Sequence, residues 1–325
     1  MVVESAVLIS IIVTSYNKGA FIQECLESVL NQTFREFEVI IVDDCSTDNT
    51  IDVLKSYLVN PKIKFLQLEV NKGANYCRNR GAELGKGLYL LFLDADDVLS
   101  LDCLTRRIQI IEKYPEADFI VFSMGTFYKR IGDSENVWIP KKEKAIERFL
   151  SHELPWAICQ PLWKKESFIK LGGFDETFSR LQDVELHTRA LFNNLTFEVC
   201  PNNYKPDCYY RINTNRITDV NLFVQNFSDG VCRYYAKFKS QAIEKNKMIF
   251  LFFSLVETSI YLETFIKKNK VSSQDKFYYR NLYLNLVKES KYKQFILKFI
   301  FLIYSALPFY PRGLKRFLKL IIQRW

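Results

Sequence analysis

Histidine is almost absent from this chain of 325 residues, which contains only His152 and His187. The eight cysteines form no C-x-x-C pair, so no familiar zinc-ligand spacing is present and no zinc cluster is expected. The amino terminus has no basic stretch ahead of an apolar run long enough for a secretory signal. These absences predict a cytosolic protein with reduced thiols.

A long uninterrupted apolar run is also lacking. The longest candidate, Phe295 to Tyr310, contains Lys298 and Pro308, whereas a membrane-spanning helix needs about 20 apolar residues. Acidic residues are scarce near the carboxyl end: from position 288 onward nine Lys or Arg residues accompany a single acid, Glu289. This segment accounts for the whole net charge of +8, and it is a candidate for binding anionic lipid or nucleic acid.

The segment from Gly313 to Trp325 has the pattern of a basic amphipathic helix, with apolar residues on one face and cations on the other. Such a helix can lie in a membrane interface, where a tryptophan sits at the headgroup level. The same pattern fits a surface helix docked on its own domain. Both interpretations stay open from the sequence, and binding to nucleic acid is not expected.

The first hundred residues alternate between apolar strands and amphipathic helices. Strands are predicted at Val7–Val13, Phe37–Val42, Ile63–Leu68 and Tyr89–Leu93, each followed by apolar residues at helical spacing. The alternation predicts an α/β fold with a doubly wound, mostly parallel sheet. Ser46 or Thr47 is expected to cap the helix after the second strand.

Further along the chain, the pattern predicts a helix at Leu101–Tyr114, a strand at Asp118–Phe127, a polar helix at Lys141–Leu150, and short strands at Phe197–Cys200 and Cys208–Ile212. Beyond about Val220 the sequence becomes helical and rich in aromatic residues. We therefore predict a domain at residues 1–220 and a helical, basic C-terminal extension at residues 221–325.

Acidic side chains follow two of the predicted strands: Asp43 and Asp44 after the second, and Asp94, Asp96 and Asp97 after the fourth. Strand ends of one direction share one edge of a parallel sheet, so the two groups can converge there. Clustered carboxylate oxygens suit Mg²⁺ or Mn²⁺. The alternative is a set of solvated turns, because Asp is a common turn residue.

Five ordered segments of this chain resemble the signature of family 2 inverting glycosyltransferases. They are Ile11–Asn17, Ser28–Thr33, Val42–Asp48, Asn71–Gly73 with Arg78–Gly81, and Leu93–Asp97. Gly172–Asp175 and Gln182–Leu186 continue the resemblance, which covers about residues 7 to 218. The resemblance implies a nucleotide-diphospho-sugar transferase fold of the GT-A type, a divalent cation, and transfer of a sugar with inversion at its anomeric carbon.

The resemblance also implies roles for individual residues. The positions that match nucleotide-sugar-binding residues are Thr14, Tyr16, Asp44, Lys72, Arg78, Asp94, Ala95 and Arg211. Tyr16 would stack on the base, and Asp44 would accept a base N–H, which suits uracil. Asp96 matches the ligand of Mg²⁺ or Mn²⁺.

Asp183 matches the catalytic base, which takes the proton of the acceptor hydroxyl as that oxygen attacks the sugar. Gln182 stands where relatives carry a first acid, and a helix N-cap is the alternative role for Asp183. Asn213 stands where relatives often carry a histidine, which leaves open whether this strand supplies a metal ligand.

Trp156 and Trp163 are candidates for stacking on the acceptor sugar. Together with the basic carboxyl end, the resemblance predicts a polyprenyl-diphosphate-linked saccharide as acceptor, at the inner face of a bacterial cell membrane. Two alternatives stay open. A sugar nucleotidyltransferase would need a glycine-rich phosphate loop after the first strand, and a catalytically silent subunit would only bind saccharide.

Overall fold

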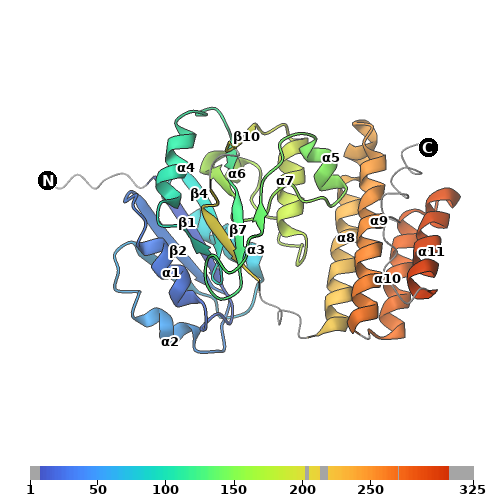
Figure 1. The fold of residues 1–325 in the computed structure, drawn as a ribbon, viewed down its shortest axis with the longest axis horizontal. Helices are drawn as coiled ribbons and strands as arrows, with labels where there is room; N and C mark the ends of the chain where they lie inside the picture. Colours follow the sequence, from blue (N-terminus) through green and yellow to red (C-terminus); the bar gives the residue numbers. More distant parts are fainter. Residues whose placement is uncertain (1–7, 202–204, 213–218, 270, 307–325) are drawn as a thin grey trace. The chain divides into compact units, whose positions relative to one another are not determined.

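The computed structural model describes residues 8–201, 205–212, 219–269 and 271–306. The chain divides into two compact units, whose elements are labelled in Figure 1. The sheet unit comprises Met1–Glu143, Pro155–Thr177 and Arg189–Asn213. The helical unit comprises Lys144–Leu154, Phe178–Thr188 and Thr214–Trp325. Each unit therefore contains segments that lie far apart in the sequence.

The sheet unit holds two sheets. The seven-stranded sheet has the order β10-β6-β9-β4-β1-β2-β3, and the four-stranded sheet has the order β5-β11-β7-β8. The strands are β1 (Ile9–Ser15), β2 (Phe37–Asp43), β3 (Ile63–Gln67), β4 (Tyr89–Asp94), β5 (Val98–Leu99), β6 (Phe119–Val121), β7 (Met124–Phe127), β8 (Val137–Trp138), β9 (Pro161–Lys164), β10 (Phe197–Val199) and β11 (Cys208–Arg211). The α/β class and the parallel pairing of β3, β2, β1 and β4 are confirmed.

The prediction of one strand at Asp118–Phe127 is wrong, because this segment breaks into β6 and β7. β6 pairs with β9 and β10 in the large sheet, whereas β7 pairs with β11 and β8 in the small one. β9 runs antiparallel between β4 and β6, and it was not predicted. The segment switches sheets at Phe122, whose N–H donates to the carbonyl of Gln160 over 3.1 Å.

The described residues contain eleven helices. The first ten are α1 (Ile22–Leu30), α2 (Thr50–Lys55), α3 (Ala74–Leu84), α4 (Cys103–Ile111), α5 (Ala145–Leu150), α6 (Lys165–Lys170), α7 (Gln182–Phe192), α8 (Val220–Glu244), α9 (Met248–Asn269) and α10 (Ser273–Leu286). The last is α11 (Lys291–Ala306). The predicted helices at residues 101–114 and 141–150 are present in shortened form as α4 and α5.

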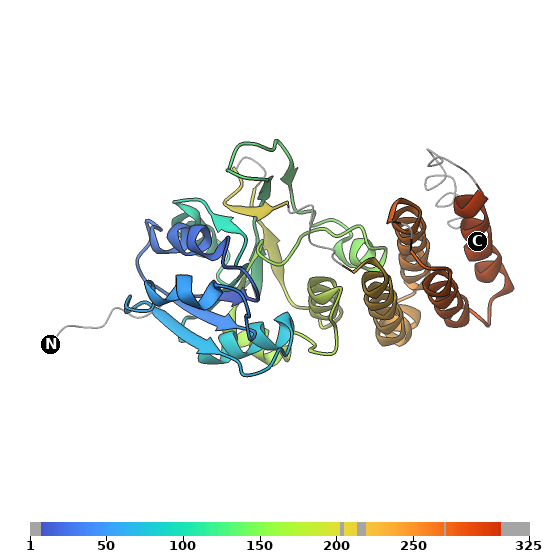
Figure 2. The ribbon, with the colours of Figure 1, turned by 90° about the horizontal axis from the view of Figure 1, so that it is seen from below.

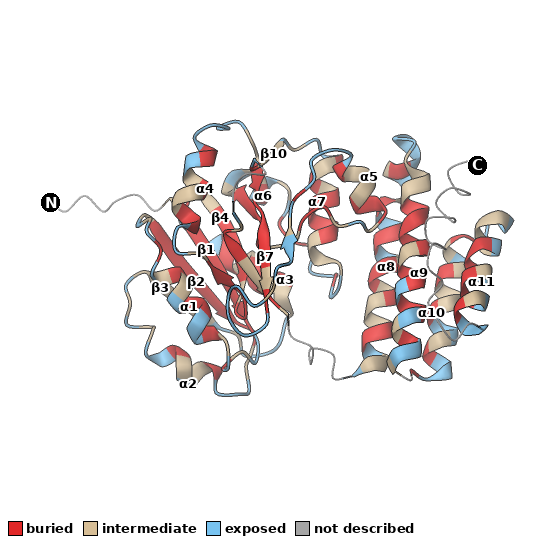
Figure 3. Ribbon diagram, in the orientation of Figure 1, coloured by how far each residue is buried: buried red, intermediate tan, exposed pale blue. Residues whose placement is uncertain are grey.

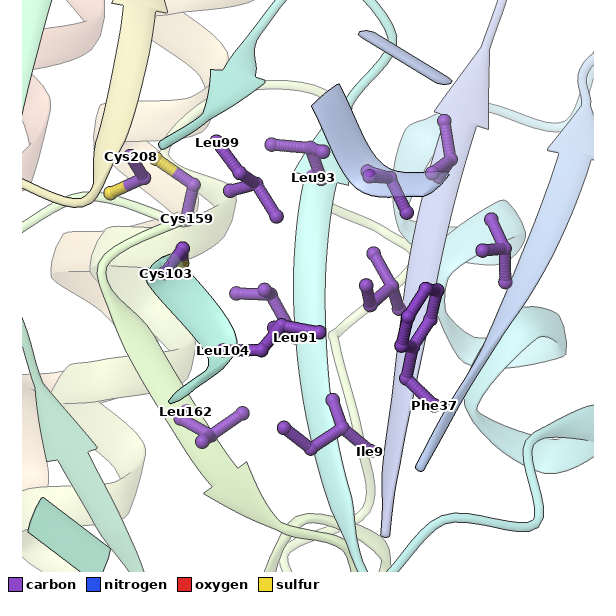
Figure 4. Close-up of a cluster of buried hydrophobic side chains, with 14 of the residues drawn as sticks. Ile9, Phe37, Leu91, Leu93, Leu99, Cys103, Leu104, Cys159, Leu162 and Cys208 are labelled. Carbon is purple, nitrogen blue, oxygen red and sulfur yellow. The ribbon is translucent and has the colours of Figure 1, made fainter. Parts of the chain in front are cut away.

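In the middle of the large sheet, β1 and β2 are buried at every residue and β4 at its inner residues, which agrees with their largely apolar sequences (Figure 3). On one face, apolar residues of β1, β2 and β4 form a core with α1 and α4, where Leu91, Leu93 and Leu104 are among the labelled side chains (Figure 4). On the other face α3 lies close to β1: a Cβ at Gly81 would come within 2.3 Å of the Ile12 side chain. This sandwich fixes the strand ends that carry the acidic residues.

In the helical unit, α8 contacts α9 and α10, and α11 contacts the same two helices (Figure 2). Asp219 caps α8 by accepting from the N–H groups of Asn221 and Leu222, and Ser272 caps α10. In the described part of the chain, α9 alone is long and apolar enough to cross a membrane by length and composition, with a mean hydropathy of 1.6. Since 67% of that apolar window is buried in the protein, α9 also fits the core helix of a bundle.

Three sequence predictions concern residues outside the described part. They are the amphipathic helix at Gly313–Trp325, the part of the apolar stretch after Ala306, and Asn213 at the position where relatives often carry a histidine.

Candidate active site in the sheet unit

The carboxyl ends of β1, β2 and β4 bring the predicted site residues of the sheet unit to one edge. In the sheet register Ser15 is the partner of Asp43, and Thr14 is the partner of Asp94. The hydroxyl of Thr14 donates to Asp94 Oδ1 over 3.2 Å. The N–H of Ala95 donates to the carbonyl of Thr14 over 3.1 Å, and Ala95 is fully buried. The convergence predicted from parallel strand ends is thus present.

Asn17 ties the loop after β1 to the loop after β2. Its backbone has a φ of +52°, in the left-handed region that Asn tolerates better than most residues. Its side-chain oxygen accepts from the N–H groups of Thr47, at 2.8 Å, and Asp48, at 3.3 Å. The predicted capping of α2 by Ser46 or Thr47 is wrong: the helix begins at Thr50, and these residues instead belong to the loop contacts.

The two carboxylates after β2 have different surroundings. Asp43 is structural, because it accepts from the backbone N–H of Ser46 at 2.8 Å and from its hydroxyl at 2.5 Å. Asp44 accepts from the N–H groups of Lys72, at 2.6 Å, and Gly73, at 2.9 Å. Gly73 has a φ of +88°, which favours glycine there. Asp44 therefore shapes the loop that carries Lys72, and its lone pairs leave room for a further donor.

Tyr16 is the exposed aromatic side chain at this edge of the sheet. It follows directly after β1, and 46% of its surface is accessible, whereas Ser15 before it is buried. An aromatic ring with an open face can stack on a planar base. The contact between Tyr16 and a nucleotide base stays a prediction, and it needs a ring that is exposed in this way.

Arg78 holds Asp94 in place. Its guanidinium is almost fully buried, at 4% exposure, and its Nη2 lies 2.7 Å from Asp94 Oδ1. The same group lies over the ring of Phe174, at 5.3 Å from its centre. Asp94 is 28% exposed at its side chain, so one part of the carboxylate faces the open edge. Arg78 is thus paired with the acidic cluster.

Lys18 is a site residue that the sequence analysis missed. Its ammonium lies 2.6 Å from Asp96 Oδ2, and the Asp96 side chain is 1% exposed. Asp96, which the resemblance matches to the metal ligand, is therefore already paired with a positive charge, the Lys18 ammonium. One sequence feature pointed to this role: Lys18 directly follows Asn17 in the loop after β1. That loop faces the carboxylates at the end of the neighbouring strand, β4.

Arg211 connects the acidic turn with the small sheet. Its Nε donates to the carbonyl of Asp96 and its backbone N–H donates to Asp97 Oδ1, both over 2.9 Å. Its Nη2 pairs with Glu24, and the guanidinium lies 4.2 Å from the centre of the Phe127 ring. Several of its donors are therefore engaged within the protein. By accepting this bond, Asp97 supports the acidic turn.

The fit of a divalent cation depends on how many ligands this edge supplies. Among the described residues, no group of three or more His, Cys, Asp or Glu side chains is arranged to hold a metal ion. Mg²⁺ is commonly bound by one or two carboxylates together with substrate phosphates and water. Asp96, with Asp94 two residues before it, fits such an incomplete set, which a diphosphate would complete.

Cys25 is the thiol next to these acids, and it does not supply a nucleophile. Burial raises the pKa of the Cys25 thiol well above its usual value, and the carboxylates of Asp97, Asp96 and Asp94 raise it further. The protonated thiol packs in the core of the sheet unit.

Asp183 belongs to the helical unit, where it is the second residue of α7. Two residues further on, Glu185 is fully buried and its Oε1 lies 2.7 Å from the ammonium of Lys237 on α8. The hydroxyls of Thr188 and Tyr234 are 2.7 Å apart, which ties the same two helices together again. The first turn of α7 is thus firmly held by α8.

Neither histidine adds a catalytic group. His187 is buried with its ring stacked on Phe149 at 5.5 Å, and burial lowers the pKa of His152 to about 4.

The prediction that Trp156 and Trp163 stack on a sugar is wrong. Both are buried, at 0% and 1% exposure, and both pack against Phe119. Their large apolar rings fill the core of the sheet unit instead.

Comparison of the whole chain with solved structures defines the fold class as that of GT-A glycosyltransferases. Staphylococcus aureus TarS residues 1–349, in complex with UDP-GlcNAc, matches with a TM-score of 0.69 and 20% identity over 94% of this chain and 93% of that chain. The mannosyltransferase PcManGT from Pyrobaculum calidifontis, solved with GDP-Man and Mn²⁺, matches with a TM-score of 0.52 and 14% identity over 92% and 87% of the two chains.

The sequence comparisons place the chain more narrowly. Residues 10–171 match the model of glycosyl transferase family 2. An uncharacterized glycosyltransferase of Haemophilus influenzae is 31% identical over 72% of this chain and 79% of its own length. The poly(ribitol-phosphate) β-N-acetylglucosaminyltransferase TarS of S. aureus is 36% identical over 118 residues, which are 35% of this chain and 20% of TarS. The chain belongs to glycosyl transferase family 2, and it is a glycosyltransferase.

Proposed function

We propose that this glycosyltransferase moves a sugar from a UDP-sugar to a hydroxyl of a saccharide acceptor, with inversion at the anomeric carbon. The observation that carries the proposal is the convergence of Tyr16, Asp44, Asp94 and Asp96 at one edge of the sheet. Tyr16 stacks on the base, Asp44 accepts a base N–H, and Asp94 contacts the ribose. The alternative of a sugar nucleotidyltransferase loses support, since the loop after β1 is not glycine-rich and the chain belongs to a transferase family.

The charge of the leaving UDP has to be stabilised as the bond to the sugar breaks. Asp96 and Asp94 would hold Mg²⁺ or Mn²⁺, which supplies positive charge to the diphosphate when it is bound. Lys18 lies beside Asp96 and adds a second positive charge at the same edge. Asp183 takes the proton from the acceptor hydroxyl. The ion pair between buried Glu185 and Lys237 on α8 holds the turn that carries Asp183.

Titration of UDP tests the donor site. We expect UDP to bind more tightly with Mn²⁺ than without it, because a cation held by Asp96 would supply positive charge to the diphosphate. The Asp96→Asn variant should lose roughly tenfold or more of the Mn²⁺-dependent gain, which is the effect of removing one charged contact. Calorimetric titration with UDP, with and without Mn²⁺, gives both affinities. Lys55→Met, on exposed α2, is the control and should behave as the unaltered protein.

Equal UDP affinity with and without Mn²⁺ in the unaltered protein would remove the metal from the proposal. If UDP did not bind at all, the donor assignment itself would be wrong. These two outcomes are distinguished by the same titration.

The acceptor belongs to bacterial surface polysaccharide synthesis in this proposal. The names of two relatives support this assignment: the S. aureus poly(ribitol-phosphate) transferase and an Escherichia coli chondroitin synthase. The segment matched by this chain covers 20% of the length of the first and 26% of the length of the second. The enzyme would work at the inner face of the cell membrane on a lipid-linked saccharide. The outward face of α11 supports this location, because Phe295 and Leu302 are each 66% exposed and Lys298 lies between them.

We expect the double variant Phe295→Glu and Leu302→Glu to lose most of its binding to vesicles of anionic phospholipid, because two apolar side chains no longer insert and two negative charges are added. Co-sedimentation with vesicles measures the bound fraction. Deleting α11 is a poorer test, since Ile296, Leu297 and Ile300 are buried in the bundle. Val59→Glu with Leu88→Glu, on exposed positions of the sheet unit, is the matched control. Undiminished sedimentation of the α11 variant would contradict the proposed membrane face.

A further inference from the structure

The loop between β7 and β8 has a defined shape although it is exposed. Asp133 accepts from three consecutive backbone N–H groups, those of Tyr128 at 2.8 Å, Lys129 at 2.7 Å and Arg130 at 3.1 Å. These bonds lower the pKa of the Asp133 carboxyl, the N–H of Tyr128 making the largest contribution. A carboxylate that organises three donors fixes the backbone of a turn. The side chains of residues 128–131, here called the recognition loop, are therefore presented in a preorganised arrangement.

The recognition loop begins beside the candidate active site. Phe127, its preceding residue, is the register partner of Arg211 in the small sheet. The Arg211 guanidinium donates to the carbonyl of Tyr128 through Nη1, over 3.4 Å, and to the carbonyl of Asp96 through Nε, over 2.9 Å. One guanidinium group thus touches both the recognition loop and the acidic turn. A molecule that reacts next to Asp96 lies within reach of this loop.

The recognition loop exposes an aromatic ring and two cations. Tyr128 is 48% exposed, and Ile131 is 47% exposed. Lys129 and Arg130 are exposed as well, and neither forms an ion pair with any residue in the described ranges. Asp133 accepts from the backbone N–H groups, and the charge of Arg130 also lowers the pKa of its carboxyl. The loop therefore presents two exposed cations, Lys129 and Arg130, next to the exposed ring of Tyr128, with Asp133 and Glu135 following in the same loop.

We propose that the recognition loop selects a negatively charged saccharide, one that carries carboxylate or phosphate groups, as the acceptor. This inference rests on the proposed transferase function and names the class of its acceptor. The ring of Tyr128 packs against a sugar ring, as aromatic residues do with apolar faces. The guanidinium of Arg130 and the ammonium of Lys129 bind the acidic groups through charge-assisted hydrogen bonds. Tyr128 thus has the sugar-stacking role that the sequence predicted for Trp156 and Trp163.

Binding of defined oligosaccharides to the full chain, in the presence of UDP, tests the proposal. The probes are pentagalacturonate, which carries carboxylates, phosphorylated mannopentaose, and neutral mannopentaose. We expect the charged probes to bind more tightly than the neutral one, with an affinity that falls as salt is added. The double variant Lys129→Ala and Arg130→Ala should bind the preferred charged probe roughly tenfold more weakly. Comparison of the two charged probes shows which acidic group is recognised.

The control variant removes the same charge elsewhere in the sheet unit. Lys86→Ala with Lys170→Ala alters two exposed lysines, one of which precedes β4 at its amino end, and should leave the affinity for all probes unchanged. Tyr128→Ala should weaken charged and neutral probes alike. Equal affinity of the unaltered protein for the charged and neutral probes would overturn the inference. So would an equal loss of probe affinity in the control variant.

UDP affinity separates failure of this inference from failure of the proposed function. The Lys129 and Arg130 variant should bind UDP as the unaltered protein does, because the loop is assigned to the acceptor. A tenfold loss of UDP affinity in this variant would assign the two cations to the donor and overturn the inference. If the unaltered protein binds no UDP, the donor assignment fails first.

Discussion

Replacing Asp183 by Asn is expected to reduce sugar transfer by about 10²- to 10⁴-fold, the usual contribution of a general base. The amide keeps the size of the side chain but cannot take the proton from the acceptor hydroxyl. The affinity for UDP should stay unchanged, because the proposed donor site is built from residues 14–96 and Arg211. Transfer rates with a saturating UDP-sugar, together with a UDP titration, measure both quantities.

Asp52→Asn is the control for this experiment, since Asp52 is exposed on α2 and pairs with Lys55 at the surface. It should leave transfer unchanged. Glu185→Gln offers a second comparison, because Glu185 is buried against Lys237. That variant is expected to lose stability as well as activity, whereas Asp183→Asn should lose activity alone. A large loss of UDP affinity in Asp183→Asn would assign Asp183 to the donor site instead of the base.

Replacing Asp207 by Asn is expected to destabilise the sheet unit by about 3–5 kcal/mol, which is the usual effect of breaking a buried ion pair. Arg107 and Asp207 are almost fully buried, at 0% and 2% side-chain exposure, and join through two hydrogen bonds of 2.8 and 2.9 Å. Without the carboxylate, the guanidinium of Arg107 is left as an uncompensated buried charge. Denaturation in urea, followed by circular dichroism, measures the change in the free energy of unfolding.

The nearby pair of Arg106 and Asp102 provides the matched control. The side chain of Asp102 is 54% exposed, and the two groups lie 3.6 Å apart. Exposed pairs contribute little, so Asp102→Asn should cost about 1 kcal/mol or less. A double variant, Arg107→Met with Asp207→Leu, should be milder than Asp207→Asn, because it leaves no unpaired charge. If Asp207→Asn had no larger effect than Asp102→Asn, the ion pair would not stabilise the fold.

Local patterns predicted the parallel strands β1, β2, β3 and β4 of the large sheet, and one edge of the site. The largely apolar segments Ile9–Ser15, Phe37–Asp43 and Tyr89–Asp94 are buried parallel strands, because apolar strands gain most when both faces are covered. Their order and direction then brought Asp94 and the loop of Asp44 to the same edge. The family was recognisable from the order of short segments before any contact was known.

Other features depended on contacts between residues far apart in the sequence. The division of residues 118–127 between two sheets follows from their pairing with β9 and β11, which lie about 40 and 80 residues further on. The burial of Trp156 and Trp163 follows from packing against Phe119. Neither is visible in a window of neighbouring residues, since periodicity reports only which side of an element is apolar.

The sequence by itself determined the class of the protein, because the short segments that resemble the family 2 signature are recognisable from their order and spacing along the chain. It also determined the buried strands, since a run of apolar residues requires cover on both faces. Only the tertiary structure decided which side chains meet. It placed Lys18 on Asp96, Arg211 between Asp96 and Tyr128, and Lys237 on Glu185. Charged groups form such pairs according to distance in space, which the spacing of residues along the chain does not encode.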